Sequence, residues 1–367
     1  MIKVLSVFGT RPEAIKMAPL VKLLSEERQI ESKVVVTAQH REMLDQVLSL
    51  FEITPDYDLD IMQAGQTLTG ITTRALAGLE DIISKEKPQI LLVHGDTTTT
   101  LAASLAAYYQ QVAVGHVEAG LRTKNKYSPY PEEMNRRLTG ALADLHFAPT
   151  AHARENLIKE NVNPQKIHVT GNTVIDALLA TAKKQYPIEQ LLPSVDWNKS
   201  IILLTAHRRE NWGEPLNNIF QAVKEIVLQC PNTELVFPVH KNPVVATPAH
   251  EILGGYDCIH LIEPLEYLPL VTLMNRCTLV LTDSGGLQEE APSLGKPVLV
   301  LREITERPEA VEAGTVKLVG TDKRKIIEET TALLLDQQLY QSMARAVNPY
   351  GDGKASIRIV KAIKDFF

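Results

Sequence analysis

Short apolar runs alternate with amphipathic stretches along the first half of the chain, and each run is rich in Val, Ile and Leu. Continuous apolar runs are typical of strands buried on both faces, and an apolar repeat of about 3.6 residues is typical of a helix. The pattern therefore predicts a parallel sheet with helices on both faces. We expect strands at Val4–Phe8, Val34–Thr37, Ile90–His94, Ala113–Val117, Leu145–Ala148 and Ile167–Val169. We expect helices at Pro12–Glu26, Arg41–Leu50, Leu68–Ser84 and Thr98–Tyr109.

The second half repeats this alternation, with expected strands at Ile201–Thr205, Leu235–Val239, Ile259–Leu261, Leu279–Thr282, Val298–Leu301 and Val316–Val319. Between the halves, Gly171-Asn172-Thr173 is a turn-prone step suited to a hinge, and a Pro/Gly-rich turn precedes a last helix, Ala355–Phe367. We therefore predict an α/β fold of two doubly wound, Rossmann-like domains facing a cleft. The first comprises residues 1–170 with the terminal helix 355–367, and the second comprises residues 171–354.

Composition narrows the class of protein. A chain of 367 residues suggests two domains, and 44% hydrophobic with 22% charged residues is ordinary for a globular protein. A net charge of −6 argues against a nucleic-acid partner, which usually leaves a basic surface. The three cysteines have no CxxC spacing and indicate a reducing compartment. There is neither a signal segment nor an apolar run near the ~20 residues of a membrane helix, so we expect a cytoplasmic protein without a membrane partner.

The stretch Ser284-Gly285-Gly286 lies between an expected strand and an expected helix. A small hydroxyl and two glycines let the backbone approach a ligand closely, and the helix behind them directs N–H groups at it, as in a diphosphate site. Glu290, six residues past Ser284, could accept hydrogen bonds from ribose hydroxyls. Gly-Gly alone would favour a plain tight turn, but the combination with both strands and Glu290 is more specific.

Ligands of doubly wound sheets bind at the carboxyl ends of the strands, so the residues after each strand are candidates. The first strand is followed by Gly9-Thr10-Arg11-Pro12, which lacks the GxGxxG fingerprint of nicotinamide binding. Arg11 offers a planar fork for phosphate. Lys16, a turn further on, is as readily a solvated helix charge as a site residue.

Three carboxylates follow later strands. Asp96 could cap the next helix, but Thr97 or Thr98 could serve equally well and free Asp96 for the cleft. Glu118, between a strand and Gly120, is an acid/base candidate. Glu132 opens a helix, where acidic residues are common for dipole reasons alone, so its role is open.

In the second half, His207 follows a strand beside two arginines, and His240 has the same placement after another strand. Arg307 is a further candidate for contact with phosphate or sugar. A metal site is not expected, because His116 and Glu118 form a lone H-x-E and no Cys/His cluster exists. The sequence also lacks a G-x-S-x-G elbow and a GxxxxGK[ST] loop.

Taken together, these motifs resemble those of the bacterial non-hydrolysing UDP-N-acetylglucosamine 2-epimerases over essentially the full chain. The matching stretches are Gly9–Lys16, His94–Thr97, His116–Thr123, Pro131–Arg137, Gly171–Thr173, His207–Asn211 and Thr282–Glu290. The family's fold is the two-domain glycosyltransferase-B type, which agrees with the two domains expected from the hydrophobic pattern.

The resemblance implies an isomerase that reversibly converts UDP-GlcNAc to UDP-ManNAc through 2-acetamidoglucal, with no cofactor. It implies a catalytic set of Asp96, Glu118, Glu132 and His207. The implied substrate contacts are Arg11, Lys16, Arg136, His240, Ser284, Gly285, Gly286, Glu290 and Arg307. Which carboxylate removes which proton stays open.

The resemblance also implies that UDP-GlcNAc acts as an allosteric activator at a second site, which includes Gln39, His40 and Gln66. Related sequences carry a basic residue where this chain has Gly65, so the strength of activation is a separate question. A homodimer and a role in supplying ManNAc for cell-surface polysaccharide are further implications. The alternatives are a hydrolysing epimerase, a UDP-sugar glycosyltransferase of the same fold, and a non-enzymatic UDP-sugar sensor.

Overall fold

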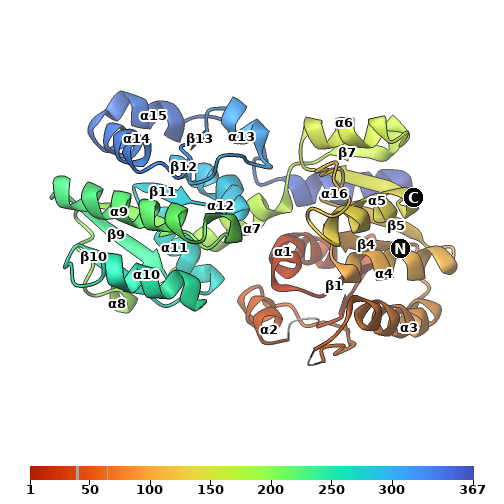
Figure 1. Ribbon diagram of the computed structural model, residues 1–367. Helices are drawn as coiled ribbons and strands as arrows, with labels where there is room; N and C mark the ends of the chain where they lie inside the picture. The colour runs from red at the N-terminus through yellow and green to blue at the C-terminus, as the bar shows by residue number, and fades with distance from the viewer. Residues whose placement is uncertain (39–40, 64) are drawn as a thin grey trace. The chain divides into compact units, whose positions relative to one another are not determined.

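The computed structural model describes residues 1–38, 41–63 and 65–367. It divides into two compact units, each built on its own parallel sheet (Figure 1). The first unit comprises Met1–Ala177 and Tyr350–Phe367, and the second comprises Leu178–Pro349. The two parallel sheets with helices confirm the predicted α/β class.

The first unit contains a seven-stranded sheet in the order β3-β2-β1-β4-β5-β6-β7, and every strand pair is parallel. The strands are β1 (Ile2–Phe8), β2 (Ile30–Val36), β3 (Tyr57–Asp58), β4 (Ile90–His94), β5 (Ala113–Val117), β6 (Leu145–Ala148) and β7 (Ile167–Val169). The sequence pattern predicted all of these except β3, which has only two residues. The core lies under the central strands, where Leu5, Val7, Leu91 and Val93 are fully buried.

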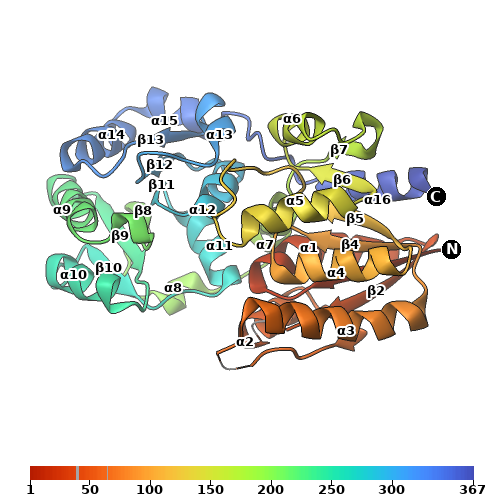
Figure 2. The ribbon, with the colours of Figure 1, turned by 45° about the vertical axis from the view of Figure 1, so that its right-hand side comes forward.

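Helices cover both faces of this sheet. They are α1 (Arg11–Glu26), α2 (Arg41–Leu50), α3 (Leu68–Glu86), α4 (Thr98–Tyr109), α5 (Glu132–Leu142), α6 (Ala151–Lys159), α7 (Thr173–Ala182) and α16 (Ala355–Phe366). Helices α3, α4 and α5 pack in a row, and α1 packs with both α2 and α16 (Figure 2). Right-handed crossovers place these two sets of helices on opposite faces of the sheet. The reason is that the chain moves toward one edge of the sheet from β1 and toward the other edge from β4.

The second unit contains a six-stranded parallel sheet in the order β10-β9-β8-β11-β12-β13. Its strands are β8 (Ser200–Thr205), β9 (Thr233–Pro238), β10 (Ile259–Ile262), β11 (Leu279–Thr282), β12 (Val298–Val300) and β13 (Val316–Leu318). Its helices are α8 (Ile188–Leu191), α9 (Glu214–Gln229), α10 (Pro243–Leu253), α11 (Tyr267–Arg276), α12 (Gly285–Glu290), α13 (Pro308–Glu312), α14 (Lys323–Leu335) and α15 (Gln337–Ala344). Phe220 of α9 packs on Phe237 of β9, with ring centroids 5.6 Å apart.

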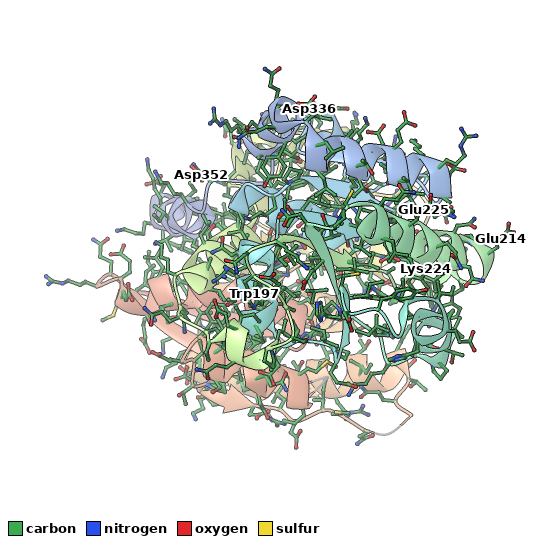
Figure 3. The ribbon with its side chains drawn as sticks, turned by 90° about the vertical axis from the view of Figure 1, so that its left-hand side faces the viewer. Trp197, Glu214, Lys224, Glu225, Asp336 and Asp352 are labelled. Carbon is green, nitrogen blue, oxygen red and sulfur yellow. The ribbon has the colours of Figure 1, made fainter. Side chains whose placement is uncertain are left out.

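Helices α9 and α14 lie side by side over this sheet. The Glu225 carboxylate on α9 pairs with Lys323 of α14 at 2.8 Å, at the solvent-exposed side of the packing (Figure 3). Elsewhere in the same unit, the buried Glu234 accepts hydrogen bonds from the Asp196 backbone N–H and the Lys199 ammonium, and lies 2.8 Å from His260 Nε2. These contacts fasten the segment before β8 to the sheet.

The chain ends in the first unit, where α16 packs against α1. Lys364 of α16 pairs with Glu27 at 2.6 Å. Asp176 of α7 accepts hydrogen bonds from the backbone N–H groups of Ala355 and Ser356, at 3.1 and 2.8 Å, and so caps the start of α16. Nowhere in the described part of the chain is a helix long and apolar enough to span a membrane.

Candidate active site

The candidate residues gather where the strand order of each sheet reverses. In the first sheet the chain leaves β1 and β4 in opposite directions, and in the second it leaves β8 and β11 in opposite directions. Ligands of doubly wound folds bind at such switch points, at the carboxyl ends of the strands. Arg11 and Asp96 follow β1 and β4 in the first unit, and His207 and Ser284 follow β8 and β11 in the second.

Glu118 is the centre of the arrangement in the first unit. It follows β5 with a φ of 63°, a left-handed conformation that is uncommon for a residue with a side chain. Its side chain is only 8% exposed. The Lys16 ammonium and the Asn172 amide (2.9 Å) both donate to Oε1, and His94 Nε2 lies 3.7 Å from Oε2. Three segments far apart in sequence therefore converge on one carboxylate.

These neighbours keep the Glu118 carboxylate ionised. Burial by itself would raise the pKa of Glu118, but the Lys16 ammonium, His94 and the hydrogen bonds from Lys16 and Asn172 together hold that pKa well below its usual range. Burial lowers the pKa of His94 to about 4, so its imidazole is neutral at neutral pH. Within the described residues, neither ring nitrogen of His94 has a hydrogen-bond partner. Glu118 is thus an ionised carboxylate that is almost entirely buried.

Asp96 and Arg136 form a second pair in the same unit. Arg136 donates to Asp96 Oδ2 from Nε (2.8 Å) and lies 2.7 Å from it through Nη2. Asn135 fixes the loop by donating to the Asp96 carbonyl oxygen at 2.8 Å. A Cβ added to Gly95, the residue before Asp96, would lie 3.4 Å from Glu118 Oε2. The Asp96 loop therefore lies directly against the Glu118 carboxylate.

Glu13 is an organising carboxylate that the sequence analysis missed. It is buried and accepts hydrogen bonds from the backbone N–H groups of Gly9 (3.1 Å) and Thr10 (2.8 Å) and from the Thr97 hydroxyl (2.7 Å). Burial raises its pKa, and these hydrogen bonds act in the opposite direction. It links the loop after β1 to the loop after β4. The capping-box spacing of Thr10 and Glu13 was the signal available in the sequence.

The two acidic residues that open α5 have different surroundings. Glu132 is half-buried at the first position of the helix. Glu133 has no exposed surface and accepts from the Thr123 backbone N–H at 3.0 Å and from Arg136 at 3.3 Å. Glu133 is therefore a structural carboxylate. Arg11 is likewise half-buried, at the first position of α1.

In the second unit, His207 is held by Asp283, a residue the sequence analysis did not select. Asp283 is fully buried, and its Oδ2 accepts from the backbone N–H groups of His207 and Arg208, both at 2.8 Å, and from Asn211 at 3.1 Å. Its Oδ1 lies 3.4 Å from His207 Nδ1. The position of Asp283 directly after β11 was the only signal in the sequence.

The His207 ring is oriented from two sides. It stacks on His240 with ring centroids 5.7 Å apart and planes at 9°. Burial lowers the pKa of His207, with Arg208 and His240 adding to the effect and Asp283 opposing it. Because Asp283 faces Nδ1, Nε2 is the nitrogen left to meet a ligand. His240 itself is exposed.

The Ser284-Gly285-Gly286 turn lies at the start of α12, as predicted. A Cβ on Gly285 would lie 2.8 Å from Arg307 Cζ, so glycine leaves room for the Arg307 side chain. Arg307 Nε donates to Glu289 Oε1 at 2.8 Å, and Glu290 Oε1 accepts from the Tyr267 hydroxyl at 2.9 Å. In the second unit, Arg307 therefore lies beside the turn, and Glu290 lies at the end of α12.

Of the three residues expected at an allosteric site, the structure describes Gln66. Gln39 and His40 lie outside the described residues. Gln66 is half-buried, and its Oε1 accepts from Arg74 Nη2 at 3.1 Å and from the Gln63 backbone N–H at 3.3 Å. Among the described residues, no group of three or more His, Cys, Asp or Glu side chains is arranged to hold a metal ion.

Comparison with known proteins adds to this geometry. A family model described as UDP-N-acetylglucosamine 2-epimerase matches residues 22–364. The UDP-N-acetylglucosamine 2-epimerase of Salmonella typhimurium is 58% identical over 372 aligned residues, covering 100% of this chain and 99% of its own. The chain belongs to the UDP-N-acetylglucosamine 2-epimerase family.

Solved structures agree. A crystal structure from Listeria monocytogenes is 57% identical, with a TM-score of 0.94, and the match covers 100% of this chain and 96% of that one. The Neisseria meningitidis UDP-GlcNAc 2-epimerase, solved with bound UDP-GlcNAc, is 55% identical with a TM-score of 0.90, covering 99% and 100%. The predicted family, fold class and enzyme class, an isomerase, are thereby confirmed.

Proposed function

We propose that this protein interconverts UDP-GlcNAc and UDP-ManNAc by inverting C2 of the sugar. The observation that carries the proposal is the buried Glu118 carboxylate, which Lys16 and Asn172 hold ionised beside the Asp96 loop. Family membership and the relative solved with UDP-GlcNAc support the substrate.

The C2 proton of the sugar is too weakly acidic for simple removal and return. We propose instead that a base takes the C2 proton while the C1–O bond to the diphosphate breaks, which gives 2-acetamidoglucal and UDP. UDP then adds back at C1, and a proton is delivered to the opposite face of C2. This route balances without an oxidant, and it needs acid/base groups near C2 and cationic or hydrogen-bonding groups at the leaving diphosphate.

We assign the proton transfers to Asp96, Glu118, Glu132 and His207, with Glu118 available as a base because its carboxylate is ionised. The order in which these groups act is left open. Arg11, Lys16 and Arg136 are the cations that the first unit offers. We assign the diphosphate and ribose to the second unit, through His207, His240, Ser284, Gly285, Gly286, Glu290 and Arg307.

The proposal is tested by proton NMR of the purified protein with UDP-GlcNAc alone in D₂O. UDP-ManNAc that carries deuterium at C2 is the expected product. Free ManNAc with UDP would instead identify a hydrolysing epimerase. No turnover without an acceptor, with UDP-GlcNAc still bound, would identify a glycosyltransferase or a sensor. Glu118→Gln is the control, and we expect its turnover to be about 10²–10⁴-fold lower, which is the usual effect of losing a general acid or base.

We further propose that UDP-GlcNAc activates the enzyme at a second site that includes Gln66, and that the enzyme is a homodimer supplying ManNAc for surface polysaccharide. A sigmoidal dependence of the rate on UDP-GlcNAc that becomes hyperbolic in Gln66→Ala would support the second site. A hyperbolic dependence in the unaltered protein would exclude it. Mass measurement in solution tests the dimer.

A further inference from the structure

The Asn172 side chain contacts both the start of α7 and the Glu118 carboxylate. It is 3% exposed and stands immediately before α7. Its Oδ1 accepts from the Val174 backbone N–H at 3.0 Å, which caps the start of the helix. Its Nδ2 donates to Glu118 Oε1 at 2.9 Å. The oxygen of this amide thus caps the N-terminus of α7, and its nitrogen donates a hydrogen bond to the Glu118 carboxylate.

Helix α7 is also the segment by which the chain passes from the first unit to the second, because the boundary between Ala177 and Leu178 lies inside it. The returning chain enters the first unit at Tyr350 and meets the same residue: the Asn172 backbone N–H donates to the Tyr350 carbonyl at 2.7 Å. Asp176, one turn along α7, caps α16 of the returning segment. The outgoing segment of the chain and the returning segment are therefore joined at Asn172 and again at Asp176.

The contacts of Glu118 show what the amide does for the carboxylate. Lys16 and Asn172 both donate to Oε1, which leaves Oε2 as the oxygen with which to exchange a proton. Lys16 is a flexible cation on α1, whereas the Asn172 side chain is fixed by its cap and its burial. A rigid amide defines the direction of a carboxylate better than a mobile ammonium group does.

We propose that Asn172 is a positioning residue for Glu118, and that it ties the direction of this carboxylate to the N-terminus of the connecting helix α7. This inference rests on the proposed role of Glu118 as an acid/base group.

The test is Asn172→Ser. A serine can still cap α7 but is too short to replace the donor to Glu118, so the helix is kept and the link is cut. We expect kcat to fall about 10- to 100-fold, the effect of one lost hydrogen bond to a charged group. We expect KM and the Kd for UDP to stay within about threefold, because Asn172 is not among the groups assigned to UDP. Asn172→Asp, which also keeps the cap but opposes Glu118 with a second negative charge, should lower kcat further.

Asn163→Ser is the matched control, because Asn163 caps the short helical turn 164–166 through an equivalent hydrogen bond to Gln165 N–H at 3.0 Å. Wild-type kcat is expected there. Amide hydrogen exchange of residues 174–178 should match the unaltered protein in Asn172→Ser, which shows that the helix is intact. A protein that fails this check, or loses UDP affinity together with kcat, would show that Asn172 is a purely structural cap and would overturn the inference.

A double-mutant cycle separates this inference from the proposed function. In a Glu118→Gln background, Asn172→Ser should reduce C2 deuterium exchange no further, since the amide acts through the carboxylate. An equal loss in both backgrounds overturns the inference, as does wild-type kcat in Asn172→Ser. If Glu118→Gln itself keeps full activity, the role of Glu118 in the proposed function is wrong.

Discussion

Asp283 illustrates how much a single residue can determine at this site. Its Oδ2 accepts three hydrogen bonds, two of them from the backbone of the loop that carries His207, while Oδ1 faces His207 Nδ1. A carboxylate that faces Nδ1 favours a proton on that nitrogen, which leaves Nε2 as the acceptor. Sequence reasoning selected His207 but not Asp283, because no pattern tells which backbone N–H groups will turn toward a buried acid. Glu13 also binds backbone N–H groups, but its capping-box spacing with Thr10 was a signal that the sequence analysis left unused.

Asp283→Asn is therefore expected to reverse the tautomer of His207. The amide oxygen of the new side chain would take the place of Oδ2, so its NH₂ would face Nδ1 and favour a proton on Nε2. We expect kcat to fall about 10²-fold or more, as for loss of an acid/base group. Nitrogen-15 NMR of the imidazole reports the tautomer directly. An unchanged tautomer with unchanged kcat would show that Asp283 only supports the loop.

Lys16 gives a second test at the same scale, through pH. Burial would raise the pKa of Glu118, and the Lys16 ammonium is the first of the groups that reverse this. In Lys16→Met burial prevails, so the pKa of Glu118 rises and the carboxylate takes up its proton at a higher pH. We expect the acid limb of the kcat/KM profile to move upward, whereas Lys22→Met, on the outer side of α1, should leave it in place. Identical limbs in both variants would exclude Lys16 as the cause.

At the level of elements, the long apolar runs were sufficient to predict the sheets. Leu91 and Val93 of β4 and Leu203 and Leu204 of β8 are fully buried, and near-continuous apolar runs are typical of strands buried on both faces. The short strand β3 was not predicted, because Tyr57–Asp58 has neither length nor an apolar run. It pairs with the end of β2. The Ser-Gly-Gly turn was placed correctly at the start of α12, since strand, glycine and helix signals coincide there.

Gly285→Ala tests the element formed by this turn and Arg307. The new methyl carbon would lie 2.8 Å from Arg307 Cζ and 2.9 Å from Nη1, so the guanidinium must move away from Glu289. Because the end of an arginine side chain moves easily, we expect little change in Tm but a roughly 10-fold weaker Kd for UDP by calorimetry. The loss should be absent in an Arg307→Ala background. Equal losses in both backgrounds would place the effect on the turn itself.

At the scale of the whole molecule, the two units are expected to respond differently to acid. Three buried histidines lie in the described part of the first unit: burial lowers the pKa of His94 to about 4, of His116 to about 3 and of His146 to about 4. In the unfolded chain each would titrate near ~6.5. Between these values the unfolded state binds more protons, so the first unit is stable above about pH 6.5 and loses stability as the pH falls toward 4. The pKa of Glu13 is raised, which has the opposite effect on stability. Above about pH 4.5 this group binds its proton more tightly in the folded state, so it adds stability as the pH falls toward 4.5.

The sequence offers a way to observe the units separately, because its two tryptophans, Trp197 and Trp212, both belong to the second unit. Tryptophan fluorescence therefore follows the second unit, and amide exchange of β4 and β5 follows the first. On lowering the pH from 7.5 to 5 we expect exchange in β4 and β5 to accelerate before the fluorescence changes. His146→Gln, which removes one of the three titrating rings, should flatten the dependence of that exchange on pH. If β4 and β5 keep their protection at pH 5, or if His146→Gln leaves the slope unchanged, then these histidines do not set the acid stability of the unit.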